Sequence, residues 1–393
     1  MKNIPLVSIF LPYYNDAKYL PIAIKSVLKQ SYPNWELILC NHASTDNCRE
    51  IAHSFKDKRI KHIDMPRNEG AGGGLVFEAM LKASSGEYSK TLCADDMLRP
   101  NALKKFILFM ENNPKVDFCF ADCEYIDEKG KDLNDSWFLN RQDFSLNHSE
   151  VDLIRLYYQG KSTIPYIGAF VKKELFSHIE INKTFVMMFD MSLWLQLLCK
   201  GYKIGYCQDK LLNYRIHKGQ MSAKGKAELA GYVCWFETVS FMQYLMSIDD
   251  VELAKAVYPD SPFYNQLKDK KDIPFFVAHR MYNWQKPYWD IVMTKMLNDS
   301  GYREHLEKTF GFGVKELREL RKADFKPSFI PLAVSEVIHK INPFKKWKIE
   351  KIYSHPSKNL SFGMLMFLFF RQIFQLLTFY PLRKKKKKEQ YSL

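Results

Sequence analysis

Two adjacent carboxylates, Asp95 and Asp96, end an apolar run that starts at residue 88 and has the character of a buried strand. In open α/β sheets, ligands bind in the crevice beyond the carboxyl ends of the strands, so both acids are expected at such a crevice. Adjacent carboxylates suit a hard divalent cation that also holds substrate phosphates. The alternative is that the pair only begins a turn or caps a helix, as acidic residues after a strand commonly do.

The elements that would position this pair alternate along the first hundred residues. Apolar runs bounded by turn residues predict strands at 7–11, 35–40, 60–65 and 88–94. Apolar residues at helical spacing predict helices at 19–30, 48–55 and 76–83. Strands that alternate with helices indicate an α/β fold with a mostly parallel, Rossmann-like sheet flanked by helices.

Six short motifs follow one another through these elements. They are Pro-Tyr-Tyr-Asn at 12–15, Ser-Val-Leu-Lys-Gln-Ser-Tyr at 26–32, Asn-His-Ala-Ser-Thr-Asp at 41–46, Asn-Glu-Gly at 68–70, Gly-Glu-Tyr at 86–88 and the acidic pair at 95–96. In this order they resemble the family 2 glycosyltransferases, which have the GT-A fold. The resemblance covers roughly residues 5–220 and implies that the acidic pair is the family's metal-binding motif.

The resemblance implies a nucleotide-sugar site at the strand ends. The residues it assigns to this site are Pro12, Tyr14, Asn15, His42, Asp46, Asn68, Gly70, Asp95 and Arg215. His42 stands where relatives hold uracil with an acid, and Asn41 replaces another acid beside it. A neutral imidazole can still hydrogen-bond a pyrimidine edge, so a UDP-sugar is the first expectation and a dTDP-sugar the second.

The resemblance also implies a divalent cation, Mn²⁺ or Mg²⁺, held by Asp96 and Asp95. The sequence Tyr-Arg-Ile-His at 214–217 matches a family motif, from which His217 would approach the metal once the donor is bound and Arg215 would help to neutralise the diphosphate. The alternative for His217 is a purely structural role. A cation at this point would offset the negative charge that builds on the leaving group.

Asp190 is the expected general base for the acceptor hydroxyl. The family carries two acids at the start of a helix that contains a tryptophan, and here Phe189 replaces the first acid while Asp190 and Trp194 remain. A single base without a nucleophile implies direct displacement with inversion. The alternative is that Asp190 only caps the helix. Tyr166, Gly168 and Trp194 are expected on the acceptor side.

The composition limits the class of protein. The chain has 393 residues, a formal net charge of +14 and 47% hydrophobic residues, enough for two domains and a sizeable core. Its eight cysteines include no Cys-x-x-Cys pair, and several stand in apolar runs. This predicts reduced, buried thiols in a cytosolic setting and no zinc site. Because a strand begins almost at once, no signal peptide or N-terminal anchor is expected.

The alternation of strands and helices stops near residue 225, which divides the chain into three expected parts. Residues 1–224 are expected to form the GT-A domain, with a nucleotide-sugar half over about 1–125 and an acceptor half over 126–224. Residues 225–358 are expected to be mainly helical. Residues 359–393 are expected to form an amphipathic helix and a polybasic tail.

The apolar stretch 362–380 contains Arg371 and further polar residues on one helical face, and a run of lysines follows it. This pattern favours a helix in the membrane interface, with residues 360–393 on anionic lipid at the cytoplasmic face of the cell membrane. Two alternatives are a helix packed on the protein and a membrane span, which Arg371 would disfavour by roughly 2.5–3.5 kcal/mol. Nucleic-acid binding is not expected, because no reader motif accompanies the basic run.

Together these features predict a peripheral membrane enzyme that transfers a sugar from a nucleotide-diphosphate sugar to a glycan or lipid-linked glycan. Synthesis of a bacterial surface polysaccharide or glycolipid is the expected setting. The main alternative is a non-catalytic scaffold that binds nucleotide or glycan, and a further one is a membrane adaptor that acts through its tail. A dinucleotide-dependent oxidoreductase is disfavoured, since the glycines at 70–74 follow the third strand and lack Gly-x-Gly-x-x-Gly spacing.

Overall fold

The computed structural model describes residues 4–70, 73–136, 148–159, 161, 164–220, 233–234, 237–283 and 286–324. Residues 1–314 form one compact unit, and residues 315–393 form a second. The described residues of the second unit belong to helix α12 (Val314–Asp324).

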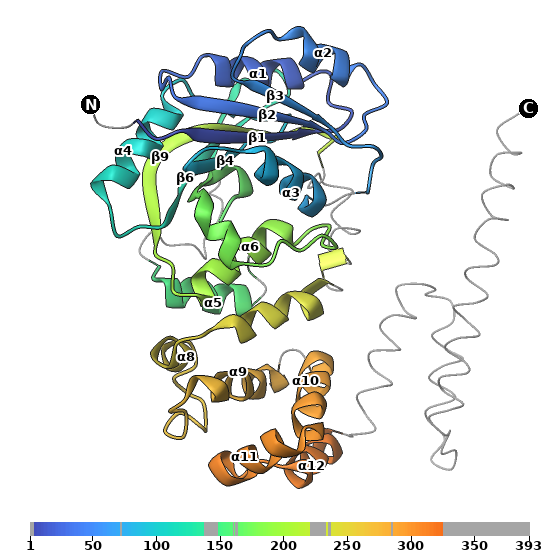
Figure 1. The fold of residues 1–393 in the computed structure, drawn as a ribbon, viewed down its shortest axis with the longest axis vertical. Helices are drawn as coiled ribbons and strands as arrows, with labels where there is room; N and C mark the ends of the chain where they lie inside the picture. The colour runs from blue at the N-terminus through green and yellow to red at the C-terminus, as the bar shows by residue number, and fades with distance from the viewer. Residues whose placement is uncertain are drawn as a thin grey trace, which may run out of the picture. The chain divides into compact units, whose positions relative to one another are not determined.

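The first half of the sheet is parallel and follows the predicted alternation (Figure 1). Its strands are, in spatial order, β3 (Ile60–Asp64), β2 (Trp35–Asn41), β1 (Val7–Tyr13) and β4 (Tyr88–Thr91). Helices α1 (Leu20–Leu28) and α2 (Cys48–Ser54) lie on one face of these strands, and α3 (Gly74–Ala83) lies on the other. Strand β4 ends at Thr91 rather than at residue 94, so a turn carries the two acids.

The second half of the sheet is mixed, which corrects the expectation of a mostly parallel sheet. It continues through β8 (Ala169–Lys172), β6 (Phe118–Ile126), β9 (Ile204–Arg215) and β5 (Met97–Leu98), and β7 (Asp132–Ser136) pairs with β6. Strands β6 and β9 are parallel, whereas β8 runs antiparallel to both β4 and β6. The β6–β7 pair is a hairpin, and a short connection of this kind permits only an antiparallel pair.

Alternate side chains of β1 pack on opposite faces of the sheet. Ile9 and Leu11 belong to a buried cluster that includes Ile24 of α1. The ring of Phe10 instead lies 5.5 Å from that of Phe77 on α3. This alternation fixes the register of β1, because a slip of one residue would exchange the two faces.

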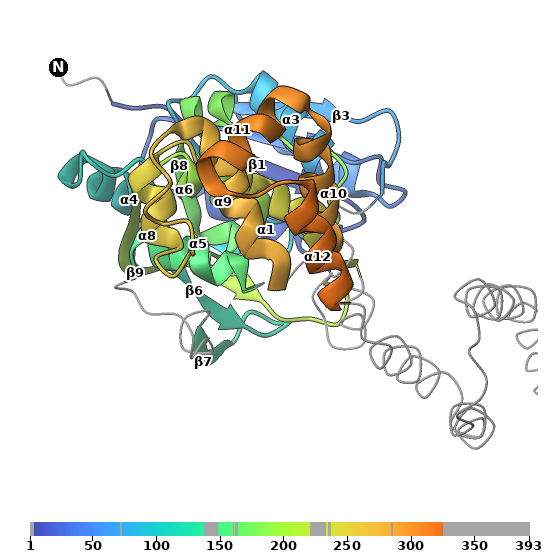
Figure 2. The same cartoon turned by 90° about the horizontal axis from the view of Figure 1, so that it is seen from below.

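Helices α4 (Ala102–Asn112), α5 (Glu150–Tyr158) and α6 (Phe189–Cys199) complete the part of the fold that contains the sheet. The helices after it are α8 (Val251–Val257), α9 (Ile273–Arg280), α10 (Lys286–Asn298) and α11 (Ser300–Phe310). Helix α8 contacts α5 (Figures 1 and 2). Helix α6 contacts the 3₁₀ helix η3 (Met242–Ser247), which also contacts α9. The expected α/β fold with a helical C-terminal region is confirmed for the described residues.

The expected boundaries at 224 and 358 stay predictions. The expected amphipathic helix and basic tail at 359–393 lie outside the described residues. Within the part of the chain that the structure describes, no helix has both the length and the apolar character needed to cross a membrane. All eight cysteines are free thiols, and six of them are buried.

Lys90 on β4 is a fully buried cation in the centre of the sheet. Its Nζ atom donates to the Thr91 carbonyl at 2.7 Å and to the Ile167 carbonyl. Burial lowers the pKa of Lys90 to about 8, because the charged form loses its hydration.

This pKa gives a testable pH dependence of stability. Because the folded-state pKa of about 8 lies below the ordinary 10.5, the unfolded chain binds more protons between these values, and the protein gains stability as pH rises. The Lys90→Met variant has no amine at this position, so its stability should not show this increase with pH. The free energy of unfolding of the original chain minus that of the variant should therefore increase between pH 8 and pH 10, as measured by urea denaturation. A difference that stays constant with pH would contradict the proposed burial of this amine.

Candidate active site

Asn15 and Asp46 connect the loops that follow strands β1 and β2. The side-chain oxygen of Asn15 accepts hydrogen bonds from the N–H groups of Thr45 and Asp46 at 2.8 and 3.3 Å. The Asp46 carboxylate accepts hydrogen bonds from the N–H groups of Ala17 and Cys48, both at 3.1 Å. Asn15 has a left-handed φ of 54°, which asparagine tolerates better than most residues. Both residues shape the strand ends, and their contact with a ligand stays a prediction.

His42 follows β2 and holds the loop after β3. Its Nε2 atom accepts a hydrogen bond from Glu69 N–H at 3.0 Å, and its carbonyl accepts one from the Asn68 side chain at 3.2 Å. Burial lowers the pKa of His42, so the neutral ring carries its proton on Nδ1. Gly70, with φ of +93°, donates its N–H to Asn68 Oδ1. The exposed Tyr14 ring meets the His42 ring edge-on at 6.3 Å, so these two residues of the predicted nucleotide-sugar site lie together.

The turn after β4 carries Asp95 and Asp96, and the segment at the end of β9 binds both. Asp96 is 1% exposed, and its Oδ1 atom accepts the backbone N–H of Arg215 at 2.8 Å. Its Oδ2 atom has no hydrogen-bond partner among the described residues. Burial first, and the adjacent Asp95 second, raise the pKa of Asp96 well above its ordinary value. The Oδ2 side of this carboxylate therefore lacks a hydrogen-bond donor among the described residues.

His217 holds the other acid of the turn. Its Nε2 atom lies 3.0 Å from Asp95 Oδ2. The second ring nitrogen, Nδ1, accepts a hydrogen bond from Gly219 N–H at 3.2 Å, so Nε2 carries the proton and donates to Asp95. The structure thus brings the predicted His217 to the acidic pair, where it orients a carboxylate.

The side chain of Arg215 is buried behind this turn. Its Nε atom donates to the Asp95 carbonyl at 2.9 Å, and one Nη atom donates to the Asp127 carbonyl at 3.0 Å. The guanidinium carbon lies 4.7 Å from the ring centre of Tyr19. At 2% exposure, the side chain fixes the turn, and its charge lowers the pKa of Asp96 against the effect of burial. Direct contact of Arg215 with a diphosphate stays a prediction.

Two side chains that the sequence analysis did not select lie beside the acidic pair. The thiol of Cys93 and one carboxylate oxygen from each of Asp95 and Asp96 all lie within 4.8 Å of one another. Burial, and then Asp95, raise the pKa of Asp16 to about 6. A signal for both was available, because Asp16 directly follows the first motif and Cys93 lies within the turn that contains the last one.

Asp190 is the second residue of α6 and acts electrostatically on the same thiol. The pKa of Cys93 is raised by burial first, then by the two acids of the turn, and also by Asp190. The pKa of the Tyr166 hydroxyl is raised by burial first and also by Cys93 and Asp190. The structure therefore brings the predicted base near the predicted metal turn. The N-cap residue of α6 is Met188, so the alternative that Asp190 is the cap does not hold.

Phe189, which stands where an acid was expected, is a core residue. It is 5% exposed, and its ring lies 5.5 Å from Phe77 of α3 and 6.3 Å from Tyr166. This position therefore anchors the first turn of α6 to the sheet through α3. An ionised side chain here would lose its hydration without gaining a charged partner.

Three other predicted residues contribute mainly to packing. Trp194 is 2% exposed and stacks on Phe118 with ring centres 6.1 Å apart. Gly168 leaves no room for a side chain, since a Cβ atom would lie 2.6 Å from the Ala121 carbonyl oxygen. Pro12 stands opposite Cys40 in the β1–β2 pair. Tyr166 is thus the predicted acceptor-side residue with a polar group near Asp190.

Glu237 holds the loop that leads into α6. Its carboxylate accepts the consecutive backbone N–H groups of Val186, Met187 and Met188 at 2.5, 3.0 and 2.9 Å. Burial raises the pKa of the Cys234 thiol, and Glu237 and Asp190 raise it further, so both carboxylates act on the same thiol. Sequence reasoning missed this residue because hydrogen bonds to a distant loop leave no local pattern.

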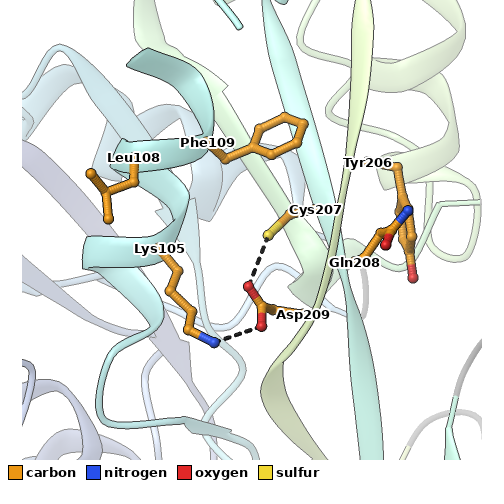
Figure 3. A pocket seen from close by; sticks show the side chains of 7 residues that line it. All are labelled: Lys105, Leu108, Phe109, Tyr206, Cys207, Gln208 and Asp209. Carbon is orange, nitrogen blue, oxygen red and sulfur yellow. Dashed lines mark hydrogen bonds and ion pairs between the residues drawn. The ribbon is translucent and has the colours of Figure 1, made fainter. Parts of the chain in front are cut away.

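A hollow of about 400 Å³ lies elsewhere, between α4 and β9 (Figure 3). Its polar lining includes Lys105, whose Nζ atom lies 2.6 Å from Asp209 Oδ1, and Cys207. None of the predicted site residues lines this hollow. Arg215 stands six residues further along β9 than Asp209, about 20 Å for an extended strand, so the hollow and the acidic turn are separate.

The acidic turn fits a divalent cation. A buried carboxylate oxygen without a partner is unfavourable by about 1–3 kcal/mol or more, and a cation would supply the missing partner. Asp96 and Asp95 offer the oxygen ligands that Mg²⁺ and Mn²⁺ prefer. The Nε2 proton of His217 points to Asp95, so this nitrogen has no lone pair for a cation in the present arrangement.

Comparison with known proteins places these features in context. Residues 8–179 match the sequence model of the family described as Glycosyl transferase family 2. The putative teichuronic acid biosynthesis glycosyltransferase of Bacillus subtilis is 28% identical over 221 residues, which span 56% of this chain and 82% of that protein. The UDP-Glc:alpha-D-GlcNAc-diphosphoundecaprenol beta-1,3-glucosyltransferase of Escherichia coli is 38% identical over 121 residues, 31% of this chain and 47% of that protein. S. aureus TarS 1–349 in complex with UDP-GlcNAc is similar with a TM-score of 0.46 and 17% identity, over 74% of this chain and 80% of that one.

The contact of Glu237 with the loop before α6 yields a prediction about stability. Glu237→Gln removes the negative charge and turns an amide group toward backbone N–H donors, so it should lower the free energy of unfolding by about 1–3 kcal/mol. Calorimetric melting of the full chain would measure this loss. Glu252→Gln is the control, since that side chain is 81% exposed and should melt like the original. Equal melting temperatures for all three proteins would refute the structural role of Glu237.

Proposed function

We propose that this chain, which belongs to the family 2 glycosyltransferases, transfers a sugar from a nucleotide-diphosphate sugar to a hydroxyl of a glycan or lipid-linked glycan. The reaction is proposed to be metal-dependent and inverting. The observation that carries this proposal concerns the thiol of Cys93: oxygens of Asp95 and Asp96 lie within 4.8 Å of its sulfur, and Asp190 also acts on it electrostatically. A transferase needs such a pairing, because one group must stabilise the leaving diphosphate and another must accept the acceptor's proton.

Asp96 and Asp95 are the proposed ligands of a divalent cation, Mn²⁺ or Mg²⁺. When bound, the cation supplies electrostatic stabilisation of the negative charge that develops on the leaving diphosphate. Asp96 offers its unpartnered Oδ2 atom, while the Arg215 N–H group fixes the orientation of the carboxylate through Oδ1. His217 orients Asp95 through a hydrogen bond of 3.0 Å. These contacts limit the movement of both carboxylates, which favours a preformed site.

Asp190 is the proposed general base. Its carboxylate would take the proton of the acceptor hydroxyl from a distance on the order of 3 Å, as the hydroxyl oxygen attacks the anomeric carbon. The bond from that carbon to the diphosphate breaks as the new bond forms on the opposite face, so a single displacement inverts the configuration. Its place in the first turn of α6 supports this role, because the positive end of the helix dipole favours an ionised carboxylate.

A UDP-sugar is the proposed donor, with a dTDP-sugar as the second choice. The name of the Escherichia coli relative gives UDP-Glc as its donor. The neutral His42 ring uses Nε2 to hold the Glu69 backbone, which leaves the Nδ1–H group as a donor for a pyrimidine carbonyl oxygen. Tyr14 borders this ring and offers a partly exposed aromatic surface for the base.

A lipid-linked or polymeric glycan is the proposed acceptor. The two named relatives act in teichuronic acid biosynthesis and on a diphosphoundecaprenol-linked sugar, according to their descriptions. Residues 360–393 are proposed to hold the enzyme at an anionic membrane surface, where such an acceptor resides. Liposomes with and without phosphatidylglycerol would test this part. Loss of binding after removal of residues 360–393 supports it, and unchanged binding contradicts it.

Nucleotide binding gives the most direct test of the metal turn. In the presence of Mn²⁺, one of UDP, dTDP, GDP, CDP or ADP should stabilise the chain by about 2.7 kcal/mol at a concentration of 100 Kd. Asp96→Asn should abolish the Mn²⁺-dependent part, and Asp209→Asn, which changes an exposed acid in the separate hollow, should not. A thermal-shift panel measures both effects. Stabilisation by none of the five nucleotides would favour the non-catalytic scaffold over the enzyme.

The role of Asp190 can be separated from that of the metal turn. Asp190→Asn should keep Mn²⁺-dependent nucleotide binding but lower kcat about 10²–10⁴-fold, because the amide cannot accept the proton. The measurement is release of UDP from UDP-glucose with a GlcNAc-diphospho-lipid acceptor, or with the donor that the panel selects. Asp209→Asn again serves as the control. Transfer by Asp190→Asn at the original rate would show that another group is the base.

A further inference from the structure

We propose that the sulfur of Cys93 is a third protein donor to the divalent cation, so that this site prefers Co²⁺, and to a smaller degree Mn²⁺, to Mg²⁺. The inference rests on the proposed function, because it takes a cation at Asp95 and Asp96 as its premise. It goes further in naming a thiolate ligand and the class of metal that such a ligand selects.

The positions of the three donor atoms suit one cation. The Cys93 sulfur and an oxygen from each of Asp95 and Asp96 lie within 4.8 Å of one another. Two ligands bound to the same cation at about 2.0–2.5 Å lie up to about 4–5 Å apart, so only small side-chain movements are needed. Cys93 and Asp95 are partly exposed, which leaves a route for the metal and for the phosphates of a donor.

Asp96 supplies an independent indication that something binds here. Its side chain is 1% exposed and its Oδ2 atom has no partner among the described residues, while its Oδ1 atom accepts the Arg215 N–H group. A buried carboxylate oxygen left without a hydrogen bond is unfavourable. The Arg215 contact holds the carboxylate in this position, so side-chain rotation into solvent does not relieve the cost. A bound cation would relieve it.

The backbone of the turn explains why these side chains meet. Strand β4 ends at Thr91, and the Cys93 carbonyl then accepts the N–H group of Asp96 at 3.2 Å. A hydrogen bond between residues i and i+3 closes a β-turn, which reverses the chain within four residues. In an extended strand, Cys93 and Asp95 would share one face and Asp96 would point to the other. The early end of β4 therefore creates the three-atom cluster.

His217 is not the third ligand of the proposed cation, because both of its ring nitrogens already form hydrogen bonds. The Cys93 thiol is the remaining candidate. The Nε2–H group of His217 donates to Asp95 and its Nδ1 atom accepts the Gly219 N–H group, so both ring nitrogens are engaged. His217 is accordingly a positioning residue for Asp95. A thiolate suits borderline and soft cations, whereas Mg²⁺ prefers oxygen ligands in a regular octahedron. The donor set of one sulfur and two carboxylates therefore favours Co²⁺ most, and it favours Mn²⁺ over Mg²⁺ to a smaller degree.

Co²⁺ reports sulfur coordination directly. The full chain with Co²⁺ and the nucleotide diphosphate selected by the thermal-shift panel should show a near-ultraviolet band from thiolate-to-cobalt charge transfer. Cys93→Ser should lose this band and Cys207→Ser, which changes a buried thiol in the separate hollow, should keep it. A Co²⁺-loaded protein without the band, or a band that persists in Cys93→Ser, would overturn the inference.

Metal affinity provides the second readout. By titration calorimetry with the same nucleotide, Cys93→Ser should weaken Mn²⁺ binding about 10-fold or more and Mg²⁺ binding much less. Cys93→Asp, which restores a third anionic ligand, should bind Mg²⁺ at least as well as the original chain. If the ratio of Mn²⁺ affinity to Mg²⁺ affinity is the same in all three proteins, the thiol is not a ligand. The proposed cation site at Asp95 and Asp96 would be unaffected by that result. Failure of the original chain to bind any divalent cation would instead refute the proposed function.

Discussion

The hydrogen bond from the Arg215 backbone to the Asp96 carboxylate joins the two halves of the sheet at the candidate site. Asp96 follows β4 of the parallel half, and Arg215 ends β9 of the mixed half. The Arg215 side chain adds a second link, because it donates to the Asp95 carbonyl. A buried carboxylate beside another acid is unfavourable, and these contacts with one positive residue keep it in the fold. The proposed chemistry depends on this junction, since it fixes both acids relative to His217.

The parts of the fold that the sequence predicted are those whose signals are local. Apolar periodicity and turn residues located β1, β2, β3 and the intervening helices to within a few residues. The antiparallel placement of β8 between β4 and β6 was not predicted, because it depends on pairing between strands about 50–80 residues apart, which has no local pattern. The motif residues Asp95, Asp96, Asp190 and His217 lie in one region of the structure, and their roles stay predictions. Glu237 acts through a loop about 50 residues away in the sequence, so no motif marked it.

The side chains around the turn are more negative than positive. Asp95 interacts electrostatically with both Asp16 and Asp96, while the buried cations Arg215 and Lys90 lower the pKa of Asp96. A diphosphate would bring further negative charge, which supports the proposal that a divalent cation accompanies it. This imbalance also accounts for Phe189, because another acid at the start of α6 would add repulsion where packing against Phe77 is needed.

The hydrogen bonds between the Glu237 carboxylate and the backbone of residues 186–188 have a consequence for the design of chimeric transferases. The residue lies beyond the segment that matches the family, in the region that the sequence assigned to the C-terminal helices. A chimera joined at residue 224 would take the loop before α6 from one parent and the residue at position 237, whose carboxylate holds this loop, from the other. Grafts intended to change the acceptor or the membrane attachment should therefore keep residues up to the end of η3 at Ser247 with the N-terminal parent.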